Sequence, residues 1–281
     1  MYERSTLPDT NRLSVLAAMI LLAYALTRFV TITPVTTSYS LLGVQLRFEV
    51  DFRTIVAVMV AALAAIGTDW LLRDHPALAR REGEPAVRTY QHWILPGLTA
   101  WVIGVPLANF STGLAWWIVF LLGGVLLILV FAAEYAVVDV SDVAHPVATV
   151  VLGALSFALY LMLAITIKSA GLRLYQILPA LVPAAGLVSI RTLYLRLGGR
   201  WLFAWVAVIM ALISQFIIGL HYWPISPVRY GLFLLGPTYA LTSLAAGLSD
   251  DTAATDRGWL RILTEPVLML LLVWGLAFLF P

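Results

Sequence analysis

The chain has 281 residues, of which 62% are hydrophobic and 11% charged, against about 45–50% apolar and about 25% charged residues in an average soluble domain. A soluble fold of this length has no interior large enough for so much apolar surface, so the composition indicates an integral membrane protein. The formal net charge is +2 and the basic residues are scattered, which argues against a nucleic-acid partner. The sequence has no cysteine, which excludes disulfides and cysteine-bound metals.

About nine apolar stretches follow one another along the chain, each close to the ~20 residues that cross a hydrocarbon core. We expect an all-α polytopic membrane protein in which residues 1–281 form a single transmembrane helical domain, one bundle surrounded by the lipid bilayer. The predicted spans are Leu13–Val30, Thr54–Leu72, Trp93–Ala108, Gly113–Phe131, Pro146–Ile167, Leu174–Leu195, Trp201–Leu220, Tyr230–Leu248 and Ile262–Phe280.

The distribution of basic residues predicts the orientation of these spans. Eleven basic residues fall on the side of the N-terminus and six on the other side, and basic loops favour the cytoplasm. The basic loop 73–92 dominates this difference with Arg73, Arg80, Arg81 and Arg88. We therefore expect a multi-pass plasma-membrane protein with a cytoplasmic N-terminus and an extracytoplasmic C-terminus.

The segment between the first two spans has a different periodicity. From Val44 to Arg53 apolar and polar residues alternate strictly, which is typical of a β-strand. The preceding residues are rich in Thr, Val and Tyr, and Gly43 is suited to a turn. We expect residues 31–53 to form an extracytoplasmic β-hairpin that covers the helix ends or offers an edge to a partner strand.

Two acidic loops are the strongest candidates for a metal site. Asp139, Asp142 and His145 follow one another at intervals of three, so that a helix would place them on one face, and Asp250 and Asp251 occupy a later loop on the same predicted side. Carboxylates and imidazole in this arrangement are suitable ligands for Mg²⁺ or Mn²⁺. The alternative is an ordinary acidic loop that precedes the helix beginning at Pro146.

Two Asp-bearing loops separated by four spans resemble the layout of the UbiA-type prenyltransferases, in which two Asp-rich loops bind a prenyl diphosphate through Mg²⁺. The resemblance covers these two motifs and the number of helices. It implies a Mg²⁺-dependent membrane enzyme that acts on a prenyl or lipid diphosphate.

A third group of candidates lies within the spans. Pro179 and Pro183 are predicted to kink the sixth span, and broken helices often line transport pathways. Glu265, one turn inside the last span, is a candidate ion or proton carrier, or else the i, i+4 partner of Arg261. Asp69 and Arg73 repeat this spacing at the end of the second span.

These observations favour a non-enzymatic, membrane-embedded binding protein or an accessory subunit of a larger membrane complex. The first alternative is a carrier of a small or lipid-like molecule, which would use the substrate pathway marked by Pro179, Pro183 and Glu265. The second is the Mg²⁺-dependent enzyme, for which no catalytic residue is assigned. We expect no cofactor, apart from Mg²⁺ under the enzyme alternative.

Overall fold

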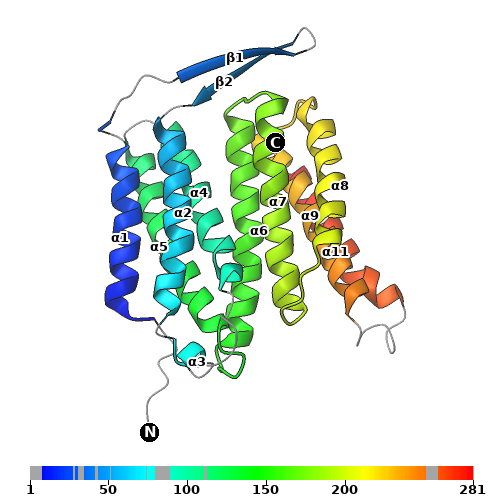
Figure 1. Ribbon diagram of the computed structural model, residues 1–281. Coiled ribbons are helices and arrows are strands. Elements are labelled where there is room, and N and C mark those ends of the chain that lie inside the picture. The colour runs from blue at the N-terminus through cyan, green and yellow to red at the C-terminus, as the bar shows by residue number, and fades with distance from the viewer. Residues whose placement is uncertain are drawn as a thin grey trace. The chain divides into compact units, whose positions relative to one another are not determined.

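The computed structural model describes residues 8–27, 29–30, 35–41, 44–50, 52–73, 75–79, 89–110, 113–250 and 259–280 (Figure 1). Within these residues seven helices are long and apolar enough to cross a membrane, and an eighth helix is apolar but shorter. The chain is therefore a multi-pass membrane protein, as its composition predicts. Its orientation in the bilayer stays a prediction.

The chain folds as two compact units, residues 1–138 and 139–281. Each unit has its own buried apolar core, and the extensive helix–helix packing lies within the units. The single bundle expected from the sequence stays a prediction.

Unit 1 contains four long helices that pack side by side (Figure 1). They are α1 (Thr10–Leu26), α2 (Phe52–Leu72), α4 (Ile94–Asn109) and α5 (Leu114–Val137), joined by the short α3 (Pro76–Ala79) and a 3₁₀ turn at Tyr90–His92. Helix α4 has 16 residues, or about 24 Å at 1.5 Å per residue, which is shorter than the ~30 Å hydrocarbon core. Helix α5, with 24 residues, is long enough to span by itself.

Two strands follow α1 and precede α2 along the chain (Figure 1). Strand β1 (Val35–Leu41) pairs antiparallel with β2 (Val44–Val50), with Val35 opposite Val50 and Leu41 opposite Val44. The sequence predicts that the second strand runs to Arg53, which is wrong by three residues, because α2 already begins at Phe52. Phe52 and Arg53 therefore belong to the helix and not to the strand.

Close helix contacts in unit 1 depend on small residues. The backbone of α2 at Gly67 lies against the side chain of Leu16 of α1, where an added Cβ atom would overlap the leucine. At Gly123 of α5, an added Cβ atom would lie 2.7 Å from Ile103 of α4. Because real side chains do not approach so closely, these glycines set the distances between the helices.

Unit 2 is built around α9, which packs against every other helix of the unit (Figure 1). In the part of this unit that the structure describes, the helices are α6 (His145–Ser169), α7 (Leu174–Arg196), α8 (Phe203–His221), α9 (Pro227–Ser249) and α11 (Trp259–Leu279). Helix α11 packs mainly on α9, and only 17% of its apolar stretch Ile262–Leu279 is buried. It is therefore the most peripheral helix of the unit.

The interior of unit 2 contains polar side chains that satisfy one another or the helix backbone. Ser189 of α7 and Thr242 of α9 are hydrogen-bonded at 2.9 Å, and Thr242 and Thr238 also lie within 2.7 Å of the carbonyl oxygens one turn earlier. Arg191 of α7 is fully buried, with its guanidinium 5.8 Å from the ring centroid of Tyr194. The contact between Ser189 and Thr242 joins α7 and α9 in the interior of the unit, where polar groups need internal partners.

Candidate functional site

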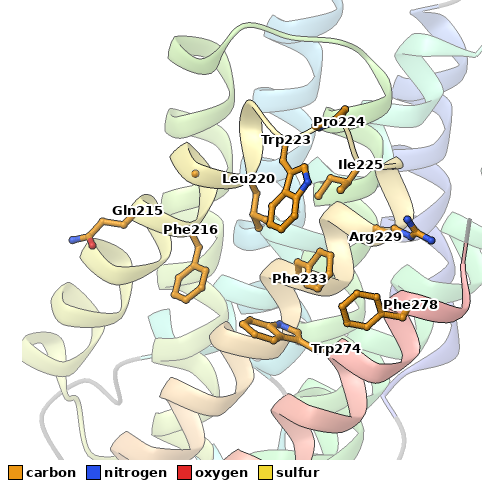
Figure 2. Close-up of a pocket in the computed structure, with 11 residues that line it drawn as sticks. Gln215, Phe216, Leu220, Trp223, Pro224, Ile225, Arg229, Phe233, Trp274 and Phe278 are labelled. Atoms are coloured by element: carbon orange, nitrogen blue, oxygen red, sulfur yellow. The ribbon is translucent and has the colours of Figure 1, made fainter.

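A cavity of about 730 Å³ lies among α8, α9, α11 and the link 222–226 in unit 2 (Figure 2). Its walls are mainly apolar, with aromatic side chains from all three helices and from the link. They are Phe216 of α8, Trp223 of the link, Phe233 of α9, and Trp274 and Phe278 of α11. Sites for small ligands typically have about 300–1,000 Å³ and mostly apolar walls with few polar groups.

The link between α8 and α9 forms one end of the cavity. Helix α8 ends at His221, and α9 begins at Pro227, a residue suited to the first turn because it has no N–H group to satisfy. Ser226 caps α9 by accepting a hydrogen bond from the backbone N–H of Arg229 at 3.4 Å. This cap places Arg229 in the first turn of α9, at the edge of the cavity (Figure 2).

Ring contacts between α9 and α11 form the opposite wall. Phe233 makes edge-to-face contacts with Trp274 at 5.7 Å and with Phe278 at 5.8 Å between ring centroids. Trp274 also lies against Gly236, where an added Cβ atom would be 3.0 Å from the indole Nε1 atom. The small residue on α9 therefore lets the indole sit close to the helix and leaves the cavity open.

The cavity opens to the surroundings of the protein. Trp223 exposes 59% of its surface and Phe278 exposes 72%. An apolar hollow that is open between membrane helices is accessible to lipid chains.

Among the described residues that line the cavity, Arg229 alone is charged. Its Nε–H group donates a hydrogen bond to the carbonyl oxygen of Phe280, which ties the start of α9 to the end of α11. A second cation lies nearby: Lys168 donates to the carbonyl oxygen of His221 at 3.1 Å and lies 5.0 Å from the ring centroid of Tyr230. His221 and Tyr230 are the sequence neighbours of two lining residues, so this end of the cavity is positively charged.

Asp139 and Asp142 lie in the turns that precede α6. The carboxylate of Asp139 accepts hydrogen bonds from the backbone N–H and the hydroxyl group of Ser141, at 2.9 and 2.6 Å. The carboxylate of Asp142 accepts one from the N–H of Ala144 at 2.9 Å. Both carboxylates thus stabilise local turns, and His145 is the first residue of α6.

The second acidic loop is described only in part. Asp250 follows the last residue of α9, and Asp251 lies outside the described residues. Among the residues that the structure describes, no group of three or more His, Asp or Glu side chains is placed to hold a metal ion. The metal site of the two acidic loops stays a prediction.

The residues of the predicted substrate pathway do not line the cavity. Pro179 and Pro183 lie inside α7, which continues through both as one helix from Leu174 to Arg196. The carboxylate of Glu265 accepts a hydrogen bond from Tyr239 at 2.8 Å and lies 3.4 Å from the guanidinium of Arg196. The side chain of its predicted partner Arg261 lies outside the described residues.

Arg196 connects three helices in this network. Its guanidinium also donates to Ser243 at 3.0 Å and to Tyr239 at 3.1 Å. The network therefore joins α7, α9 and α11 at the end of the unit opposite to Arg229. The other predicted pair is confirmed, with Arg73 and Asp69 separated by 3.7 Å.

Two features of the structure are not indicated by the sequence, the cavity in unit 2 and a buried pair in unit 1. The cavity combines residues from α8, α9 and α11, whose aromatic side chains look like any others in an apolar span. In unit 1, the imidazole Nδ1 of His92 lies 2.7 Å from the carboxylate of Glu134, and both side chains are buried. These two residues are 42 positions apart, so local spacing gives no indication that they meet.

Comparisons with known proteins identify the family of the chain, and the function of that family is unknown. The model of a family described as "Protein of unknown function (DUF5656)" matches residues 32–280. No curated protein and no solved structure shows significant similarity to the chain.

Proposed function

The chain belongs to the DUF5656 family of proteins of unknown function, and we propose from its own geometry that it is a membrane-embedded binding protein for the hydrocarbon chain of a membrane lipid. The binding site is the aromatic cavity among α8, α9 and α11. The observation that carries this proposal is an apolar, ligand-sized cavity that is open between membrane helices.

The proposal combines two functions expected from the sequence. Binding without chemistry agrees with the leading interpretation of a non-enzymatic binding or accessory protein, and a lipid-like ligand agrees with the carrier alternative. The binding site differs from the predicted pathway, because the lining residues do not include Pro179, Pro183 or Glu265. The support for a lipid-like ligand comes from the apolar cavity alone.

Gly219 offers a way to fill the cavity without disturbing the packing. It lines the cavity, and an added Cβ atom there would meet no atom within 4 Å. We therefore expect Gly219→Phe to fold normally and to occupy space in the cavity. Gly275→Phe is the matched control, because Gly275 on α11 is equally open but does not line the cavity.

The test is quenching of tryptophan fluorescence by a phosphatidylcholine with brominated acyl chains, titrated into delipidated protein in detergent. Trp223 and Trp274 line the cavity and are natural reporters. We expect saturable quenching in the wild type and in Gly275→Phe, loss of the saturable part in Gly219→Phe, and a smaller amplitude in Trp274→Phe. Identical titrations of the wild type and Gly219→Phe would disprove binding in the cavity.

A further inference from the structure

The distribution of charge in unit 2 differs strongly between its two ends. From Val143 to Ser249 the sequence has no Asp or Glu, although it has six basic residues, namely Lys168, Arg173, Arg191, Arg196, Arg200 and Arg229. The acidic residues of the unit lie before α6, after α9, or near the start of α11 at Glu265. We call the α6–α7 turn, the link 222–226, the helix turns on either side of each, and the last turns of α11 together the Arg229 end.

The Arg229 end is therefore a cationic region without Asp or Glu side chains of its own. The sequence has no Asp or Glu in 165–178, 215–235 or 270–281, the segments that form this end. Lys168, Arg173 and Arg229 all lie there. Positive charge at the border of a bilayer attracts anionic groups, and here it has no acidic side chain in these segments to neutralise it.

Arg229 is the member of this group that also contacts the cavity. Its Nε–H group is bonded to the carbonyl oxygen of Phe280, which orients the guanidinium. Among the described residues this is the only hydrogen bond of its side chain, so both terminal nitrogens remain for a ligand. A guanidinium held in this way can donate two parallel hydrogen bonds to a phosphate.

We propose that the ligand of the cavity is an anionic phospholipid, whose phosphate binds Arg229 while one acyl chain enters the cavity. This inference rests on the proposed function, because it needs the chain-binding cavity. Lys168 adds positive charge behind the phosphate without contacting the cavity itself. The cationic edge and the apolar wall together match a molecule that has a negative head and a hydrocarbon tail.

The test compares two lipids that have the same brominated chains and different heads. Phosphatidylglycerol has a net negative charge, and phosphatidylcholine has none. We expect phosphatidylglycerol to quench the cavity tryptophans with a Kd about tenfold lower than that of phosphatidylcholine, because both heads carry the phosphate but the quaternary ammonium of choline is repelled by the positive charge of Arg229.

Three variants separate recognition by Arg229 from a general effect of charge. Arg229→Gln should reduce the preference to about twofold or less, since the amide has no charge and no guanidinium fork. Arg229→Lys should retain part of the preference for phosphatidylglycerol. It also shows whether the variants fold without the hydrogen bond from the Arg229 side chain to the carbonyl oxygen of Phe280. Arg173→Gln is the matched control, because Arg173 lies at the same end but does not line the cavity, and it should retain the full preference.

Each alternative outcome has a distinct meaning. Equal affinity of the wild type for the two lipids, with quenching abolished by Gly219→Phe, would overturn the assignment of the head group and leave the cavity as the binding site. Quenching by neither lipid would overturn both proposals. An equal loss of preference in Arg229→Gln and Arg173→Gln would show that the general positive field, and not Arg229, selects the head group.

Discussion

The imidazole Nδ1 of His92 and the carboxylate Oε2 of Glu134 lie 2.7 Å apart in the interior of unit 1, where their side chains are only 7% and 0% exposed. His92 ends the 3₁₀ turn before α4, and Glu134 lies in the last turn of α5. The contact therefore joins two elements that are far apart in the sequence. A buried polar group of this kind depends on its partner, because burial removes it from contact with water.

Removal of the Glu134 carboxylate should strongly destabilise unit 1. We expect Glu134→Leu to lower the free energy of unfolding by about 3 kcal/mol, since His92 would remain buried without its partner. Glu134→Gln should cost less, because the amide can still form a hydrogen bond with the imidazole. Thermal unfolding in detergent measures both effects. Arg73→Gln is the control: its pair with Asp69 is largely exposed, so it should cost about 0.5 kcal/mol or less. An equal loss in Arg73→Gln and Glu134→Leu would contradict the structure.

The contact between α1 and α2 can be tested by adding one methyl group. We expect Gly67→Ala to lower the free energy of unfolding by about 1–3 kcal/mol, because the new Cβ atom overlaps the side chain of Leu16. The double variant Leu16→Ala/Gly67→Ala should recover part of this loss. Gly153→Ala is the control, since a Cβ atom at Gly153 would meet no atom within 4 Å. A double variant less stable than predicted from the two single changes would argue against direct contact.

The network at the start of α11 should contribute little to stability despite its several hydrogen bonds. Arg196 and Glu265 expose 33% and 55% of their side chains, and partly exposed pairs contribute about 0.2–1 kcal/mol. A double-mutant cycle with Arg196→Gln and Glu265→Gln should give a coupling energy in this range. Tyr239→Phe should reduce this coupling, because Tyr239 contacts both residues. A coupling energy well above 1 kcal/mol would contradict the partial exposure of this pair.

The two acidic loops can be tested with Mg²⁺ and a prenyl diphosphate. Under the enzyme hypothesis, both ligands together raise the melting temperature, by an amount that corresponds to about 2.7 kcal/mol at one hundred times the Kd. Asp139→Asn/Asp142→Asn should abolish this shift. The double variant should keep nearly its full stability without metal, because the amide oxygens of Asn can accept the same turn hydrogen bonds. The absence of any ligand-dependent shift in the wild type would leave Asp139 and Asp142 with a role in the turns alone.

The sequence by itself determined the membrane class and the approximate positions of the long helices that the structure describes. Both follow from a local pattern, a run of apolar residues long enough for a bilayer. The i, i+4 pair of Asp69 and Arg73 is local in the same way, because one helical turn brings the two residues together.

Only the tertiary structure decided which distant residues meet. Glu134 contacts His92, Glu265 contacts Arg196, and Phe233 packs against Trp274 and Phe278, all through packing between helices. The aromatic cavity arises in the same way, from three helices whose individual sequences all read as ordinary spans. In a membrane chain nearly every helix face is apolar, so the pattern that marks a helix does not indicate which face meets a neighbour and which borders a cavity.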